Sequence, residues 1–269
     1  MTENSKVPAP ARLASTVVLL RDGRAGIEAF MVVRHHAIDF ASGALVFPGG
    51  KVDAQDSSAD WSDLAAWPAG IGNRAIFVAA ARETFEEAGL LLARRKGAAD
   101  LLDADHVHRL VERDRARVHK GELPFAEVLK GEGLELAVDL MVPFAHWITP
   151  EPVPKRFDTH FLLIAAPVQQ LGAHDGGESV EGIWVRPQQA LDDADAGRRT
   201  LVFATSMNLK KLAAHRTVAE AVAATRGQPI VTVMPRVEYS PQGRKVHIPA
   251  EAGYGVTEVL FANASVPGN

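Results

Sequence analysis

Stretches of β-branched and apolar residues alternate with turn residues near the start of the chain. Leu13–Arg21 and Ile27–Arg34 are two such stretches, and residues 22–26 between them are charged or glycine-rich. This pattern predicts two strands joined as a hairpin, followed by a short strand over Gly43–Phe47. Residues 1–12 are polar and contain proline, so we expect a flexible arm there.

The pattern changes to helical periodicity after residue 72. Four apolar residues recur at the spacing of one helix face, namely Val78, Ala81, Phe85 and Ala88. Asn73 can cap the N-terminus of this helix and Gly89 can end it, so the pattern predicts a helix from Asn73 to Ala88. The preceding residues 51–72 are rich in Asp, Ser, Gly and Pro. They predict a loop, with a short helix at 59–66.

The second half of the chain mixes strand and helix patterns without regular alternation. Helices are expected over 104–130, from Pro187, over 205–214 and over 217–226. Strands are expected over Phe144–Ile148, Arg156–Ala166 and Val180–Val185, with shorter pieces at 230–238 and 244–248. This order predicts an α+β fold in which a mixed sheet lies between helices, an α/β/α sandwich.

Composition narrows the chemistry. The 269 residues are 47% hydrophobic and 23% charged, with a net charge of -4, so bulk charge favours neither a nucleic-acid partner nor a membrane surface. Cysteine is absent, which excludes thiolate metal sites and points to a hard cation such as Mg²⁺ or Mn²⁺. No signal-like apolar run follows the N-terminal charges, and the last residues are not a peroxisomal address, so we expect a cytoplasmic protein.

Three carboxylates gather on the helix predicted at 73–88. Glu86 and Glu87 lie three and four residues after Glu83, which places all three on one helix face. Arg82 lies four residues before Glu86. Such a pair of adjacent glutamates is more often a solvated surface than a site. Here a Gly49-Gly50 pair precedes the helix, where backbone can approach a metal or phosphate closely.

At this point the sequence resembles the Nudix hydrolases, whose signature ends in Arg-Glu-aliphatic-x-Glu-Glu-x-Gly-aliphatic. Residues 82–90 match it, except that Thr84 stands at an aliphatic position. The first half of the signature is degenerate: Asp56 stands where a glutamate is usual, and a 25-residue gap (57–81) replaces seven residues. We expect this insertion to shape substrate choice more than chemistry.

The likeness extends beyond the signature to one branch of the family, which includes the peroxisomal coenzyme A diphosphatases of animals. It is carried by Phe47–Asp53, Asp56–Trp61, His146–Leu163 and the region from Glu178 to Trp184. The resemblance implies a Nudix domain over 13–250, with insertions at about 51–72 and 100–135 and a C-terminal tail at 251–269.

The resemblance also implies roles for individual residues. Glu83, Glu86 and Glu87 would hold the metal, with the Gly50 carbonyl as a further ligand, and Arg82 would orient the glutamates. The general base stays open between a glutamate of this helix, such as Glu86, and a loop glutamate. Of the loop residues, Glu178 aligns best, and Glu181 lies close by.

Residues outside the signature are candidates for substrate binding. On a strand, Arg156, Asp158 and His160 share one face, so Arg156 could meet a phosphate and Asp158 could line the cleft. A structural pair between Arg156 and Asp158 is the favoured alternative. Arg34, between a strand and the glycine pair, is a further candidate, although it lacks the spacing of a known coenzyme A motif.

Aromatic and imidazole side chains of the insertions have simpler interpretations. Trp61 and Trp67 either cap the substrate site or anchor their loop, and anchoring is favoured because Trp dominates local burial. His106, His108 and His119 lie in the charged segment 104–130 and are expected to be solvated.

The function expected by resemblance is hydrolysis of the diphosphate bond of a nucleoside diphosphate linked to a group X, most specifically coenzyme A or acyl-coenzyme A. One alternative is a pyrophosphatase for nucleotide sugars, ADP-ribose or dinucleotides. A catalytically silent Nudix module that senses a ligand is another, supported by Asp56 and the long gap. The expected partner is a small nucleoside diphosphate derivative, without nucleic acid or membrane, and a homodimer is possible.

Overall fold

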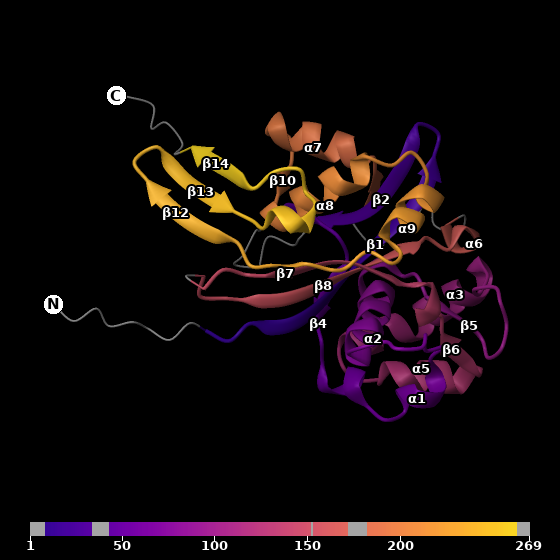
Figure 1. Ribbon diagram of the computed structural model, residues 1–269. Helices are drawn as coiled ribbons and strands as arrows, with labels where there is room; N and C mark the ends of the chain where they lie inside the picture. Colours follow the sequence, from indigo (N-terminus) through magenta and orange to yellow (C-terminus); the bar gives the residue numbers. More distant parts are fainter. Residues whose placement is uncertain (1–8, 34–42, 152, 172–181, 263–269) are drawn as a thin grey trace.

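A nine-stranded mixed sheet lies between two layers of helices in the computed structural model (Figure 1), which describes residues 9–33, 43–151, 153–171 and 182–262. The strands of this sheet are β1 (Arg12–Gly23), β2 (Gly26–Val33), β3 (Ala44–Val46), β4 (Gly49–Lys51), β7 (Val142–Ile148), β8 (Phe157–Ala165), β9 (Gly182–Val185), β10 (Thr200–Leu201) and β11 (Thr232–Val233). The main path is β10-β3-β2-β1-β8-β7-β11, while β4 pairs with β1 and β9 with β2. The expected α+β sandwich is confirmed.

The helices divide between the two faces of the sheet (Figure 1). One layer contains α1 (Trp61–Leu64), α2 (Arg74–Glu83), α3 (Ala104–Leu110), α4 (Ala116–His119) and α5 (Phe125–Glu132). The other contains α7 (Pro187–Asp195), α8 (Phe203–Ala213) and α9 (Val218–Thr225), and α6 (Val168–Leu171) follows β8. Within the described ranges, no helix has the length and apolar character needed to cross a membrane.

The central strands explain how the sheet separates two cores. The hairpin of β1 and β2 forms as predicted, and β1 also runs parallel to β8, from Arg12 opposite Phe157 to Leu20 opposite Ala165. Successive side chains of a strand point to opposite faces. Val17 and Leu19 accordingly join the core beneath α2, while Val18 and Leu20 join the core beneath α8 and α9.

The helix predicted over 73–88 is not a regular α-helix throughout. The Asn73 side chain accepts a hydrogen bond from the Ala75 amide at 3.1 Å, which confirms the predicted cap. After Glu83 the backbone widens into a π-helical turn over Thr84–Ala88, and Gly89, with φ of 64°, ends it in the left-handed region. Wide turns of this kind occur frequently at functional sites.

Two further segments differ from expectation. The predicted helix at 104–130 is divided into α3, a π-helical turn over Val111–Arg115, α4 and α5. Pro124 caps α5 and marks the break from α4, because proline cannot continue a helix. The segment expected as a tail contributes a strand to a separate three-stranded sheet. That sheet comprises β12 (Arg236–Ser240), β13 (Gly243–His247) and β14 (Glu258–Ala262).

The remaining elements are short. A two-stranded sheet joins β5 (Ala93–Arg95) to β6 (Leu134–Leu136), and 3-10 turns occur at Ala54–Ser57, Val138–Leu140 and Ala250–Ala252. The turn at Ala54–Ser57 places one acidic side chain, Asp56, in the interior. This side chain is central to the site described next.

Candidate active site

Helix α2 is buried along nearly its whole length, and its C-terminal end carries the glutamates. Small alanines and Val78 occupy its middle, and Phe85 is fully buried at its end. This packing fixes α2 against β1 and β4, so the carboxylates that follow lie beside the Gly49-Gly50 strand. The predicted core role of Phe85 is confirmed.

Arg82 contacts three of the carboxylates of the site. Its Nε and Nη2 each donate to an Asp56 carboxylate oxygen at 3.0 Å, and Nη2 also donates to the Lys51 carbonyl at 2.9 Å. Its Nη1 donates to Glu83 and to Glu86, both at 2.9 Å. Burial opposes the charge on Arg82, but its carboxylate partners raise its pKa above the ordinary value. The guanidinium therefore stays charged and ties three carboxylates together.

Asp56 is the residue whose role the sequence left unrecognised. Its side chain is fully covered, and it also accepts a hydrogen bond from the Asp53 amide at 2.8 Å. Burial raises the pKa of Asp56 despite the opposing effect of Arg82. Asp56 is thus the buried counter-ion of Arg82, and its position in the degenerate half of the signature was the available clue.

The three glutamates lie at the end of α2 and in the turn that follows, and the side chains of Glu83 and Glu86 are 13% and 8% exposed. Burial raises the pKa of Glu83 to about 7; Arg82 opposes that rise, and the charges of Glu86 and Glu87 add to it. Glu87 accepts a hydrogen bond from the Gly49 amide at 2.9 Å, which links the helix end to β4. A buried group of like charges is a site that a cation would stabilise.

The two glycines allow β4 to approach this cluster. A Cβ on Gly50 would lie 2.2 Å from Glu83 Oε1, and a Cβ on Gly49 would lie 2.4 Å from the Ser15 carbonyl oxygen. Real Cβ atoms do not approach so closely, so any larger residue would displace β4 or the glutamate. The glycine pair is therefore required by close approach to Glu83 and Ser15, whereas the sequence predicted an approach to a metal or phosphate.

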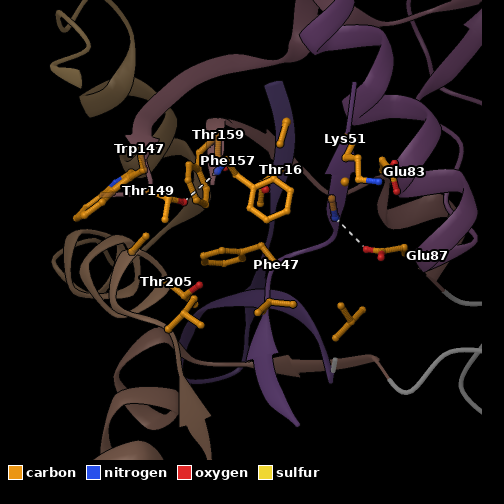
Figure 2. A pocket seen from close by; sticks show the side chains of 18 of the residues that line it. Thr16, Phe47, Lys51, Glu83, Glu87, Trp147, Thr149, Phe157, Thr159 and Thr205 are labelled. Atoms are coloured by element: carbon orange, nitrogen blue, oxygen red, sulfur yellow. Dashed lines mark hydrogen bonds between the residues drawn. The ribbon is translucent and has the colours of Figure 1, made fainter. Parts of the chain in front are cut away.

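A cavity of about 1670 Å³ opens from the glutamates across the face of the sheet covered by α8. Figure 2 shows Glu83 and Glu87 at one end, Phe47 in the middle and Trp147 with Thr149 at the other end. Its further walls include the apolar side chains of Phe157, Phe161, Leu201, Phe203, Val246 and Phe261. The space thus has a charged end and a long, largely apolar extension.

The substrate residues expected on β8 do not line this cavity. Arg156 donates to the carbonyls of Thr149 and Ala9, and Asp158 contacts His146, so the pair between them that the sequence favoured does not form either. The alternate face of the strand lines the cavity instead, through Phe157, Thr159 and Phe161. The predicted residues Arg34 and Glu178, together with Glu181, lie outside the described residues.

The insertions contribute differently from expectation. None of residues 57–81, all of which are described, lines the cavity. Trp61 and Trp67 anchor their loop, as favoured: Trp61 Nε1 donates to the Gln55 carbonyl at 2.8 Å, and Trp67 Nε1 donates to the Trp61 carbonyl at 2.7 Å. Trp61 and the partly buried Trp67 pack in the same core as the buried residues of α2.

The helical insertion reaches the site. His119, expected to be solvated, places Nδ1 3.2 Å from Glu86 Oε2 and lines the cavity, although its side chain is 70% exposed. Arg115 Nε donates to the Glu86 carbonyl at 2.7 Å and satisfies a backbone acceptor at the helix end. His106 pairs with Glu132, away from the cavity.

A family model described as the NUDT19 Nudix domain matches residues 66–201 of this chain. The chain belongs to this Nudix hydrolase family. The match contains the helix with Arg82 and the three glutamates, whereas Gly50 and Asp56 precede it. The resemblance inferred from the sequence is confirmed at the level of the family.

Known proteins agree with this assignment. The chain is 26% identical over 198 residues to a putative nudix hydrolase 7 of Caenorhabditis elegans, covering 73% of this chain and 58% of that protein. It is 24% identical over 207 residues to an acyl-coenzyme A diphosphatase NUDT19 of Xenopus laevis, covering 62% of this chain and 54% of that protein. The matches therefore span little more than half the length of these relatives.

Among solved structures, a NUDIX hydrolase from Alicyclobacillus acidocaldarius superposes with a TM-score of 0.65 at 28% identity. The superposition covers 80% of this chain and 96% of that chain. The Nudix fold is thereby established for most of the described domain.

Proposed function

We propose that this chain hydrolyses the diphosphate bond of a nucleoside diphosphate linked to a group X, with coenzyme A or an acyl-coenzyme A as substrate. The observation that carries the proposal is the cavity, which has the glutamate cluster at one end and a long apolar extension at the other. A diphosphate needs its charge neutralised where the bond breaks, and an acyl chain needs an apolar wall.

The residues present fit a hard divalent cation. Glu83, Glu86 and Glu87 offer carboxylate oxygens, and the proposed fourth donor is the Gly50 carbonyl, on a residue that lies directly against Glu83. Burial raises the pKa of Glu83, with a further rise from the charges of Glu86 and Glu87, so a bound cation would favour its ionised form. Mg²⁺ or Mn²⁺ bound there would neutralise phosphate charge and lower the pKa of the attacking water.

The chain's own groups position the reaction. Arg82 donates hydrogen bonds to Glu83 and Glu86 and so positions both carboxylates. Asp56 accepts from Arg82 and positions the guanidinium in turn. Glu87 is held against β4 through the Gly49 amide. Glu86 is our candidate to accept the proton of the attacking water, and Glu178 is the alternative base. The Oε2 atom of Glu86, which does not contact Arg82, lies next to His119 Nδ1.

The apolar extension supports coenzyme A esters over smaller X groups. Typical ligand pockets are roughly 300–1,000 Å³, and this cavity is larger. The Xenopus laevis and Gallus gallus relatives are named acyl-coenzyme A diphosphatases, which supports the same assignment. The products would be adenosine 3',5'-bisphosphate and a phosphopantetheine compound.

A substrate panel tests the proposal. The purified chain is incubated with Mg²⁺ and, separately, coenzyme A, a long-chain acyl-coenzyme A, ADP-ribose and NADH, and products are separated by chromatography. We expect the coenzyme A compounds to have the highest kcat/KM, and Glu87→Gln to abolish turnover of all four. Asp63→Asn, a change of an exposed carboxylate that does not line the cavity, is the control and should retain activity.

Two outcomes separate the claims. Faster turnover of ADP-ribose or NADH overturns the substrate assignment and keeps the diphosphatase. No hydrolysis of any compound at high protein concentration, with metal binding unchanged in Glu87→Gln, overturns the enzyme and favours a ligand-sensing module.

A further inference from the structure

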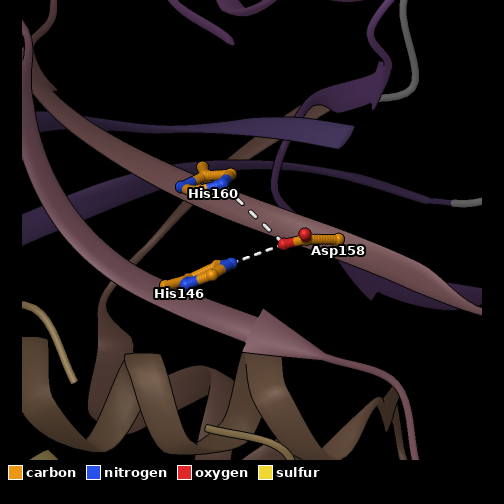
Figure 3. A group of neighbouring side chains, drawn as sticks. All are labelled: His146, Asp158 and His160. Atoms are coloured by element: carbon orange, nitrogen blue, oxygen red, sulfur yellow. Dashed lines mark hydrogen bonds and ion pairs between the residues drawn. The ribbon is translucent and has the colours of Figure 1, made fainter. Parts of the chain in front are cut away.

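Two histidines and an aspartate form a second cluster on the sheet, outside the proposed active site. His146 lies on β7, and Asp158 and His160 lie on β8, where His146 and His160 are opposite one another. Figure 3 shows the Asp158 carboxylate to one side of the two imidazoles, with a dashed line to each. His146 Nε2 contacts Asp158 Oδ1, and His160 Nε2 lies 3.7 Å from the same oxygen.

The three side chains point away from the large cavity. Residues of β8 alternate between the two faces, so Thr159 and Phe161 line the cavity while Asp158 and His160 face the opposite side. One ligand atom from each of the three residues lies within 4.8 Å of the others, and all three residues are partly exposed. The imidazole rings stack with their centroids 4.0 Å apart, which brings both Nε2 atoms to the same side.

We propose that His146, Asp158 and His160 form a binding site for a transition-metal ion of the Zn²⁺ class, separate from the glutamate site. Two imidazole nitrogens and one carboxylate oxygen suit Zn²⁺, Fe²⁺ or Co²⁺ and disfavour Mg²⁺, which prefers oxygen donors. Three protein ligands leave a position for water. The ligand atoms must be unprotonated to hold the ion, so any proton that they carry passes to solvent when the ion enters.

A second residue orients one of the ligands. His146 Nδ1 lies 2.8 Å from Thr232 Oγ1 on β11, the strand next to β7. Metal-binding histidines commonly use their other ring nitrogen in this way, which fixes the ring and leaves the first nitrogen for the ion. The Thr232 contact therefore directs His146 Nε2 toward Asp158.

A buried hydroxyl beside the cluster provides an independent indication. Ser15 on β1 is the strand partner of His160, is fully buried, and its Oγ has no hydrogen-bond partner among the residues that the structure describes. Buried hydroxyls are normally satisfied. An occupant of the site could supply the missing partner, because Ser15 and His160 share this face of the sheet.

Ser15 of β1 lies between the two sites. Ser15 pairs with His160 on one side and with Gly50 of the glutamate site on the other. Two strand steps place the backbones of His160 and Gly50 about 10 Å apart. The clusters are thus neighbours that hold different ions through different donors.

Titration with Co²⁺ in the presence of excess Mg²⁺ tests the site, because histidine-bound Co²⁺ has visible absorption bands. We expect the full wild-type chain to take up one equivalent with these bands, and Glu86→Gln to do the same. His160→Ala should lose them. Thr232→Val, which keeps all three ligands, should weaken Co²⁺ binding by about 10–100-fold.

His106→Ala is the matched control, because His106 pairs with Glu132 at 3.1 Å and belongs to no three-ligand cluster among the described residues; its titration should equal that of wild type. The proposal is overturned if His160→Ala keeps the bands, if Glu86→Gln loses them, or if wild type shows none. Should His160→Ala fail to fold, His160→Gln and Thr232→Val decide the matter in the same way.

Discussion

Replacing Asp56 with Asn tests whether a buried ion pair holds the glutamate cluster in place. Asp56 accepts two hydrogen bonds from Arg82 at 3.0 Å, and its side chain is fully covered. Removing one partner of a buried pair costs about 3–5 kcal/mol. Arg82 keeps Glu83 and Glu86 in the variant, so we expect the lower end of this range, about 3 kcal/mol.

Two measurements check this expectation. Thermal unfolding should show Tm lowered by roughly 6–12 °C, since 1 kcal/mol corresponds to about 2–4 °C for a domain of this size. The kcat for the preferred diphosphate should fall by about 10–100-fold, the usual effect of removing a group that orients metal ligands. KM should change less, because Asp56 does not line the cavity.

Asp53→Asn is the matched control, because Asp53 lies 3.7 Å from Arg82 but is more than half exposed. Its loss should cost less than about 1 kcal/mol of stability. If Asp56→Asn behaves like this control, the glutamates alone hold Arg82 and the reasoning is refuted.

Three further changes have defined outcomes. Gly50→Ala places a Cβ 2.2 Å from Glu83 Oε1, so kcat and Mg²⁺ affinity should fall at least about tenfold with little change in Tm. Burial raises the pKa of Glu83 to about 7 from an ordinary 4.5. In EDTA its contribution to stability should therefore be greatest below pH 4.5 and be lost as pH rises through 7. Unfolding should show a loss of at most about 3 kcal/mol over this range, and Glu83→Gln should show none. Tyr254→Phe removes a hydroxyl that accepts from Trp147 at 2.9 Å and donates to Asn208 at 2.8 Å, so urea unfolding should show a loss of about 1–3 kcal/mol.

Each of these has a contrary result. Full activity of Gly50→Ala would mean that Glu83 has no fixed position. Stability of the EDTA-treated chain that rises between pH 5 and 8, after correction with Glu83→Gln, would contradict the assigned direction of the pKa. An unchanged midpoint for Tyr254→Phe would mean that the hydroxyl is replaced by water.

Local patterns in the sequence were sufficient for the hairpin, the α+β class and the grouping of the three glutamates at the end of α2. Periodicity and capping residues act within a few positions, so Asn73 and Gly89 could be recognised directly. The π-helical turn at Thr84–Ala88 could not, because the same residues fit an α-helix and the wider turn depends on packing around it.

The residues that line the cavity could not be predicted from local patterns either, because they come together only in the tertiary fold. Alternation on β8 showed that Arg156 and Asp158 share a face, but which face lies over the cavity depends on how distant helices cover the sheet. His119 was likewise assigned to solvent because nothing near it in the chain indicates Glu86, 33 residues earlier. Contacts of this kind are made by the tertiary fold alone.

The parallel pairing of β1 with β8 has a consequence for how the protein is made. Arg12 meets Phe157, so the N-terminal strand must wait for more than half of the chain before its neighbour exists. Closing so long a loop is entropically costly, and non-local pairing slows folding. Helix α2 can form early, but β1 acquires its partner β8 last, and with it the sheet beneath α2. We therefore expect competence for hydrolysis to arise late in folding, in the same step that completes the sheet.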